Sequence, residues 1–272
     1  RADGAPSPMR GRKSWALLAY LLLSDAPPTR SQLAGLLFAE ADDPLGALRW
    51  SLAEVRRCLG EGASLTGDPV TLHLPEGTVV DVAVLTRSSW VEAVEVTGLD
   101  AELMDGLEVR GAPAFESWLL SERRRLAAAA ENVLHEAAVG LLARGALDRA
   151  RGFAVRAVAM NPLDENHQAL LVRLYRLAGE DAAAEKQYAG YRRLLDAELG
   201  VPPGVAVEAA MRERRRERVA DPSDAVIEAA IETGTAAIAA GAIEAGITSL
   251  RSSVRLSDAG RSPRLQVRSR QL

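Results

Sequence analysis

Residues 134–162 read LHEAAVGLLARGALDRARGFAVRAVAMNP, and their order of small and large residues returns 34 positions further along the chain. The second copy lies in residues 172–191, VRLYRLAGEDAAAEKQYAGY. The corresponding positions are Ala138 and Val172, Leu141 and Tyr175, Gly145 and Gly179, Ala150 and Ala184, Ala154 and Tyr188, and Ala157 and Tyr191. A repeat of this length is typical of stacked pairs of helices.

Each copy predicts two helices joined at a glycine. The small residues let neighbouring helices approach closely, the larger ones fill the gaps, and Gly145 and Gly179 each end a first helix before an acidic turn. This is the spacing of tetratricopeptide repeats. Because such units bury their faces only against one another, they serve as scaffolds and binding surfaces.

The composition is that of an ordinary soluble protein with room for two domains. Of the 272 residues, 48% are apolar and 26% are charged, and the low aromatic content of 4% accompanies many Ala and Leu residues. The net charge is -4, and residues 1–95 carry 9 basic and 12 acidic side chains. Any contact with nucleic acid must therefore rest on a local basic patch.

Several features favour a cytoplasmic protein. The single cysteine, Cys58, cannot form an internal disulfide, which fits a reducing compartment. No apolar run reaches the roughly 18 residues that a membrane helix needs. The chain begins with Arg1 rather than Met, so we expect it to be part of a longer protein.

The first third of the chain predicts three helices. Residues 15–23 form an apolar run that ends at a Ser-Asp-Ala-Pro-Pro turn, and Thr29 then caps a short helix that ends near Phe38. The third helix covers residues 44–59. Its expected inward stripe is Leu45, Leu48, Leu52, Val55 and Leu59, and its expected outer face is Arg49, Trp50, Glu54, Arg56 and Arg57.

A β-hairpin is expected after the third helix. Residues 70–74 and 78–82 alternate in polarity, and Pro75-Glu76-Gly77 separates them as a turn. Three helices closed by a hairpin make a winged helix-turn-helix. The expected fold class is therefore mainly α, with a winged helix-turn-helix and a small β-hairpin wing followed by an α-helical, tetratricopeptide-like repeat domain.

The rest of the chain is expected to be helical and to divide into further domains. Residues 90–107 have a helical pattern, a long helix starts near Phe115, another ends near Arg218, and a third helical pair begins near residue 225. The expected domains are residues 1–86, 87–218 and 219–272, the last being the start of a further helical repeat region. We expect its basic end, residues 260–272, to be frayed.

The third helix is the part of the chain best suited to enter the major groove of DNA. Arginine can donate two parallel hydrogen bonds to guanine, so Arg49, Arg56 and Arg57 are the expected base readers. Trp50 and Ser51 could contact methyl groups or phosphates. Arg12, Lys13 and Arg30 are the expected phosphate contacts, which would fix the register without reading the sequence.

The sequence gives no support for an enzyme. His73, His135 and His167 lie on the expected hairpin and on two separate repeat helices, without cysteines or paired carboxylates at metal-binding spacing. There is no Walker-type phosphate loop and no nucleophile elbow. We therefore expect no catalytic residues, no cofactor and no metal.

The order of these parts resembles the antibiotic-regulatory-protein family of bacterial transcription factors, over about residues 10–218. The segments that carry the resemblance are GRKSWALLAYLLLSDAPPTRSQLAGLLF (11–38), DPLGALRWSLAEVRRCLG (43–60), GDPVTLHLPEGTVVDV (67–82), FESWLLSERRRL (115–126) and ELGVPP (198–203). Either module alone is widespread, so the specificity of the resemblance comes from their occurring together.

The resemblance implies an OmpR/PhoB-type winged helix followed by a bacterial transcriptional activator domain. It implies a regulator, expected to be an activator, that binds repeats in double-stranded promoter DNA, contacts the sigma or another subunit of RNA polymerase, and can act as a homodimer. Arg49, Trp50, Ser51, Arg56 and Arg57 would lie on its recognition-helix surface.

Two departures from the family pattern matter. The strands that open the family's winged helix are missing before Gly11, which predicts an incomplete sheet and a weaker core. Glu54 replaces a basic or neutral residue, and a carboxylate close to phosphates would cost affinity.

Two other functions remain open from the sequence. The winged helix could have lost DNA binding and serve as a protein–protein interaction adaptor, since its net charge is negative. Alternatively, the repeats could hold a small ligand and act as a sensor. The dependence of duplex binding on salt separates the first alternative from a DNA-binding regulator.

Overall fold

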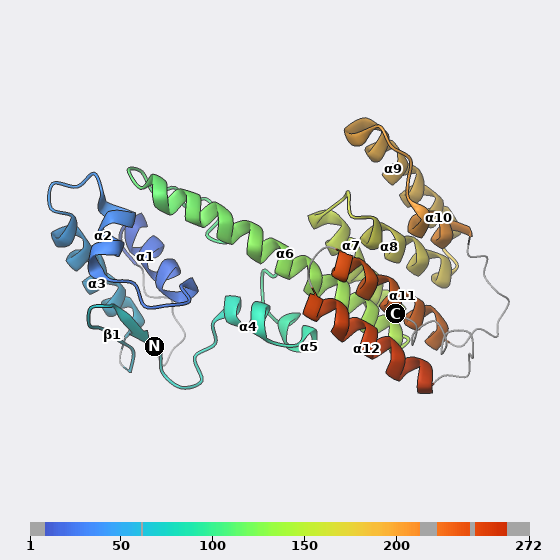
Figure 1. Ribbon diagram of the computed structural model, residues 1–272, viewed down its shortest axis with the longest axis horizontal. Helices are drawn as coiled ribbons and strands as arrows, with labels where there is room; N and C mark the ends of the chain where they lie inside the picture. Colours follow the sequence, from blue (N-terminus) through green and yellow to red (C-terminus); the bar gives the residue numbers. More distant parts are fainter. Residues whose placement is uncertain (1–8, 61, 213–221, 240–242, 260–272) are drawn as a thin grey trace. The chain divides into compact units, whose positions relative to one another are not determined.

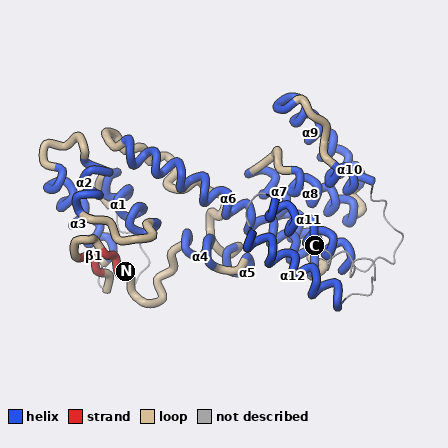
Figure 2. Tube along the Cα trace, in the orientation of Figure 1, coloured by secondary structure: helices blue, strands red, loops and turns tan. Residues whose placement is uncertain are grey.

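A computed structural model of the chain describes residues 9–60, 62–212, 222–239 and 243–259. The described chain is mainly helical, as predicted, and contains one small two-stranded sheet (Figure 1 and Figure 2). It divides into two compact units: a first unit within residues 1–88 and 101–128, and a second unit within residues 89–100 and 129–272. The domain boundaries expected from the sequence stay a prediction.

The three helices expected at the start of the first unit are present. They are α1 (Arg12–Leu23), α2 (Arg30–Phe38) and α3 (Pro44–Leu59). Thr29 begins α2 as predicted, in a capping box in which its hydroxyl accepts from the backbone N–H of Gln32. Asp43 caps α3 by accepting from the backbone N–H of Gly46 (2.8 Å).

The hairpin lies one segment earlier than predicted. Its strands are β1 (Ser64–Thr66) and β2 (Thr71–His73), paired antiparallel with Leu65 opposite Leu72. Gly67, at φ 84°, supplies the left-handed backbone of the turn. Leu65 and Val70 are 1% and 2% exposed, so the hairpin is anchored in the core.

The second strand expected at residues 78–82 does not form. Val79 is 77% exposed, so the alternating pattern has no apolar surface to cover. Residues 75–78 instead close a turn through a hydrogen bond from the N–H of Thr78 to the carbonyl of Pro75 (3.1 Å), and α4 (Asp81–Arg87) follows.

The first turns of α6 (Pro113–Ala143) complete the core of the first unit. Phe115 and Leu119 are 0% and 1% exposed and pack with the three helices and the hairpin. The ring of Trp118 meets Tyr20 edge-on at a centroid distance of 4.8 Å. One expected inward residue is corrected: Leu45, in the first turn of α3, is 49% exposed.

The helical pattern expected for residues 90–107 forms only α5 (Trp90–Ala93). Gly98 and Gly106 have φ angles of 74° and 71°, and Met104 also takes a left-handed conformation at φ 54°. These residues cannot continue a right-handed helix, so the segment turns repeatedly before α6 begins.

The second unit contains the expected helical pairs. Its helices after α6 are α7 (Leu147–Met160), α8 (Glu165–Ala178), α9 (Asp181–Leu199), α10 (Val205–Arg212), α11 (Pro222–Ala239) and α12 (Ile243–Ala259). Gly145 and Gly179 have φ angles of 71° and 78°, as turns at helix ends require. Residues at the repeated small positions are buried, including Ala138, Ala150, Ala154, Ala157 and Ala184, each at most 1% exposed.

The third helical pair is present as α11 and α12, which pack on each other. Val226 of α11 joins the core formed by α6, α7 and α8. The expected helix after the second pair is described to Arg212 as α10, and its expected continuation to Arg218 lies outside the described residues. So does the segment expected to be frayed, residues 260–272.

One described helix is long and apolar enough to cross a membrane by composition alone. An 18-residue window of α6 has a mean hydropathy of 1.2, although no unbroken apolar run of that length exists in the sequence. Half of that window is buried inside the protein. Such burial is what the core helix of a globular domain shows.

His135 gives the second unit a testable dependence on pH. Its side chain on α6 is buried, its Nε2 lies 2.8 Å from the hydroxyl of Thr233 on α11, and its ring lies 5.0 Å from that of His167 on α8. Burial and, to a smaller extent, the nearby His167 lower its pKa from 6.5 to about 3, while Asp164 acts in the opposite direction. The folded protein therefore keeps this imidazole neutral.

We predict that His135→Gln flattens the loss of stability in mild acid. Below about pH 6.5 the unfolded chain binds a proton at His135 that the folded chain does not, so the unfolding free energy falls by up to about 1.4 kcal/mol per pH unit. Urea unfolding of wild type and variant between about pH 7 and pH 5 measures the slope. His73→Gln, on an exposed strand, is the control, and an unchanged slope in His135→Gln would contradict the prediction.

Candidate nucleic-acid interface

One face of α3 is buried and the opposite face is exposed. Leu48, Leu52 and Val55 are at most 1% exposed, whereas Arg49, Trp50, Ala53, Arg56 and Arg57 are exposed. The exposed residues are spaced by one, three or four positions, so they share one side of the helix. This side presents three guanidinium groups and an indole ring that is 55% exposed.

The guanidinium groups differ in how firmly they are held. Arg49 makes an ion pair with Asp43 at 3.5 Å, and both side chains are more than two-thirds exposed. Arg56 donates from Nε to the carbonyl of Leu65 on β1 (2.8 Å), which ties its position to the hairpin. Of the three arginines, Arg49 is therefore the one whose removal should disturb the fold least.

Glu54 does not lie on the outer face, which corrects the sequence-based expectation. It is 8% exposed and accepts hydrogen bonds from Arg57 Nη2 (2.6 Å), Arg57 Nε (3.0 Å) and the backbone N–H of Arg10 (2.6 Å). The bonds from Arg57 and then from Arg10 lower the pKa of its carboxyl to about 2. The expected repulsion between this carboxylate and phosphates is thus offset by Arg57.

Ser51 is also misplaced by the sequence analysis. It was expected on the recognition surface but is 1% exposed, because it lies on the side of α3 that faces the protein. Its hydroxyl cannot reach DNA in this conformation. The burial of Ser51 does not follow from the apolar stripe, because a small polar residue can lie on either face of a helix.

A cleft of about 720 Å³ brings several predicted residues together in the first unit. Arg12, Lys13, Trp50 and Ser51 line it, with Gly11, Phe38, Ala47, Glu108, Val109 and Arg110. Gly11 has a φ of 81°, a left-handed conformation that favours glycine, and it lies against the ring of Trp50. Lys13 lies over the ring of Phe38 at 5.0 Å.

Arg110 adds a cation that sequence reasoning missed. It is exposed and lines the same cleft as Arg12 and Lys13, although it follows the hairpin by more than thirty residues. Glu108 is the acidic residue of this lining, and its carbonyl lies 3.5 Å from Arg12 Nη1. Nothing in the local pattern around Arg110 indicated that it would lie near α3.

Arg30 lies apart from the cleft lining and has a structural role. Its Nε donates to the carbonyl of Gly67 (3.1 Å) and its backbone N–H to Asp68 (2.9 Å), so it joins α2 to the hairpin turn. Its part in phosphate binding stays a prediction.

The three histidines also differ from their sequence-based description. His73 is exposed on β2 and His135 is buried, as a surface and a packing residue would be. His167, however, lies within 4 Å of two carboxylates, Glu131 and Asp164. The expectation that no paired carboxylates lie near the histidines is therefore wrong for His167. Glu131 comes from a different helix, so its proximity has no signature in the local sequence.

We predict that Glu54→Gln lowers stability near neutral pH. The folded-state pKa of about 2 lies below the ordinary value of 4.5, so the contribution of Glu54 is present above about pH 4.5 and is lost as the pH falls toward 2. The variant should unfold at lower urea than wild type at about pH 7, and the gap should narrow by about pH 3. Glu122→Gln, from another (i, i+3) pair, is the matched control. A gap that stays constant with pH would contradict the assigned role.

The comparisons with known proteins support the sequence-based resemblance. Residues 86–215 match the family model described as "Bacterial transcriptional activator domain". No curated protein sequence matches the chain. Among solved structures, the chain is similar to "Mycobacterium tuberculosis EmbR in complex with low affinity phosphopeptide", with a TM-score of 0.58 and 19% identity over 86% of this chain and 67% of that chain.

These findings agree with the architecture. The structural similarity concerns the fold, a small helical unit with a hairpin followed by helical pairs, and the family model covers the segment in which the helical pairs begin. Residues 86–215 are therefore a bacterial transcriptional activator domain, and the comparisons support the resemblance of the chain to the antibiotic-regulatory-protein family of bacterial regulators.

Proposed function

We propose that the chain is a sequence-specific DNA-binding transcription activator. In this proposal α3 enters the major groove, where Arg49, Arg56 and Arg57 read bases and Trp50 contacts methyl groups. The protein acts in the cytoplasm and has no catalytic activity, in keeping with a family of regulators rather than enzymes.

The observation that carries the proposal is the division of α3 into two faces. Leu48, Leu52 and Val55 of its apolar stripe are buried in the core, so the helix cannot turn over to hide its arginines. Arg57 meets Glu54, yet its own side chain is still 46% exposed. A helix whose outer face carries three arginines and a tryptophan is suited to a groove lined by acceptors and flanked by phosphates.

The cleft beside α3 supports a second set of contacts. Arg12, Lys13 and Arg110 outnumber Glu108 in its lining, so its local charge is positive although the whole chain is acidic. Cations beside a recognition helix would hold the phosphate backbone and fix the register of reading. For Arg30 to contact the phosphate backbone of DNA, its side chain would have to release the carbonyl of Gly67 in the hairpin turn.

We propose that the second unit recruits RNA polymerase, through sigma or another subunit. Its helices follow a tetratricopeptide-like order, and such arrays bind proteins along their surfaces. Near the end of this series Leu177, Leu199, Val201 and Val205 are 46%, 59%, 46% and 83% exposed. Exposed apolar residues of this kind are what a protein partner covers.

Binding to promoter repeats as a homodimer, or as adjacent copies, follows from the charge balance. A net charge of -4 gives little general attraction to DNA, so one copy should bind modestly. Two associated copies on repeated half-sites would bind DNA more tightly than either copy alone, although each copy makes the same contacts to its own half-site.

Selection of bound duplexes from a random pool tests the proposal directly. We expect an enriched repeated motif, whose spacing gives the arrangement of the bound copies, and binding that falls steeply with added salt. If no duplex binds even at low salt, the DNA-binding function is wrong and a protein-binding adaptor remains.

We predict that Arg49→Ala weakens binding to the selected motif by about 1–3 kcal/mol, or roughly 5- to 150-fold in Kd. Its ion pair with Asp43 is highly exposed, so the melting temperature should change little. Fluorescence anisotropy with a labelled duplex measures the affinity. Arg87→Ala, which removes an exposed arginine of α4, is the charge-matched control. Equal losses in the two variants would mean that α3 does not read the motif.

A further inference from the structure

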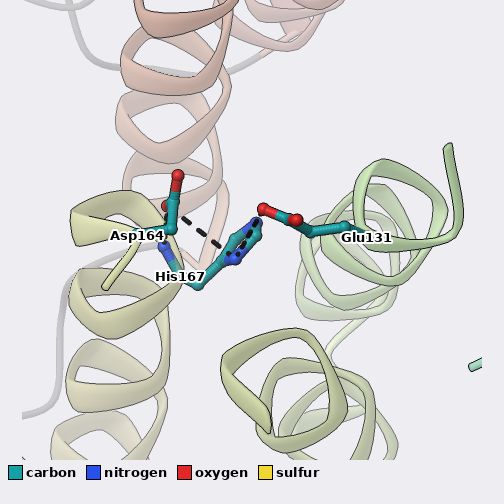
Figure 3. A group of neighbouring side chains, drawn as sticks. All are labelled: Glu131, Asp164 and His167. Atoms are coloured by element: carbon teal, nitrogen blue, oxygen red, sulfur yellow. Dashed lines mark hydrogen bonds and ion pairs between the residues drawn. The ribbon is translucent and has the colours of Figure 1, made fainter. Parts of the chain in front are cut away.

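Three side chains of the second unit lie close together in Figure 3, with the imidazole of His167 between Asp164 and Glu131. Glu131 comes from α6, Asp164 precedes α8, and His167 lies in the first turn of α8. One ligand-type atom from each residue lies within 4.8 Å of the other two. His167 is 5% exposed, and its Nδ1 faces the two carboxylates without a hydrogen bond.

The distances around Nδ1 are longer than hydrogen bonds. Nδ1 lies 3.4 Å from Glu131 Oε1 and 3.8 Å from Asp164 Oδ1. A good N–H···O bond spans about 2.7–3.2 Å. By contrast, two ligand atoms that each lie about 2.1 Å from a tetrahedral Zn²⁺ ion are about 3.4 Å apart. The 3.4 Å separation of Nδ1 and Glu131 Oε1 matches two ligands of one ion, and a small movement of Asp164 would complete the set.

The two carboxylates have no other cationic partner among the described residues. Glu232, a partly buried carboxylate elsewhere in the second unit, meets Arg173 (3.4 Å). Glu131 instead accepts from the side-chain amide of Asn161 (3.1 Å), and Asp164 accepts from the backbone N–H of His167 (2.9 Å). These neutral donors orient the carboxylates and leave their charges uncompensated.

We propose that Glu131, Asp164 and His167 bind one divalent transition metal ion, with Zn²⁺ the best match to an imidazole and two carboxylates. The fourth position is left for water, because the side chains of Glu131 and Asp164 are 20% and 29% exposed and give the ion a route from solvent. The positive end of the α8 dipole opposes a cation here, but it amounts to about half a charge against two carboxylates.

The consequence of such a site is a link between α6 and the start of α8. Glu131 precedes Asp164 by 33 residues and His167 by 36 residues, so the ion would join the first helical pair to the second. Because the unfolded chain does not hold these ligands together, binding would stabilise the fold. The second unit would then sense metal, independently of whether the first unit binds DNA.

Titration of the untagged 272-residue chain with Zn²⁺ tests the proposal. After removal of metals with a chelator, we expect one Zn²⁺ ion per chain, measured by competition with a chromogenic chelator, and a rise in melting temperature. Glu131→Gln and His167→Gln should each weaken binding by at least about tenfold and abolish the rise. Glu185→Gln and His73→Gln, which alter an exposed carboxylate and an exposed imidazole, should bind like wild type.

The outcomes separate a site from a chance cluster. If Zn²⁺ binds equally well to wild type and to Glu131→Gln, or if wild type shows no saturable binding, the proposal is wrong. His167 is buried, so its variant is scored only if circular dichroism shows the same helix content without metal; if it fails this check, Glu131→Gln alone decides. Variants that lose stability without metal but leave the Zn²⁺-dependent rise unchanged would show a packing role and overturn the site.

Discussion

The burial of one apolar stripe on α3 determines how the rest of the candidate interface is arranged. Leu48, Leu52 and Val55 are each worth about 2 kcal/mol when fully buried. Exposed ion pairs contribute at most about 1 kcal/mol, so no arrangement of surface charges can rotate the helix. Because successive residues turn by about 100°, fixing the stripe also fixes Arg49, Trp50, Arg56 and Arg57 on the outside. The proposed reading of DNA by this helix would thus be a consequence of how it packs.

The dependence of a segment on what it packs against also explains why the helices were predicted in place, whereas the hairpin was predicted one segment too late in the chain. Helical periodicity recurs every three or four residues, so the ranges of α2 and α3 follow from local sequence. The repeated small residues likewise located the pairs from α6 to α9, since close packing selects small side chains wherever two helices cross. Strand alternation needs only a few residues, and Val79 satisfies it while remaining 77% exposed. Whether such a segment becomes a strand depends on an apolar surface elsewhere in the fold, which the local pattern does not contain.

The candidate interface was predicted in part, for a related reason. Side chains on the exposed arc of α3 follow from geometry, but Glu54 lies near the edge of this arc and Ser51 lies beyond it, on the side that faces the protein. Arg110 was missed because it reaches the cleft through the folding of residues 94–112, where left-handed glycines break the helical pattern. Long-range proximity of this kind has no signature in the spacing of residues along the chain.

Two carboxylates in the structure meet the same physical problem with different partners. Glu54 has an arginine three residues later on its own helix, so its charge is compensated locally and its position is settled by α3 alone. Glu131 has Ala127, Ala128, Leu134 and His135 at the corresponding positions of α6, and His135 is engaged with Thr233. No arginine or lysine lies three or four residues from Glu131 on α6, so a cationic partner must come from another helix or from solution. It lies beside an imidazole nitrogen and a second carboxylate. A bound cation would stabilise the ionised form of both carboxylates. The absence of a local arginine is therefore what makes this part of the second unit a place for metal rather than an ordinary ion pair.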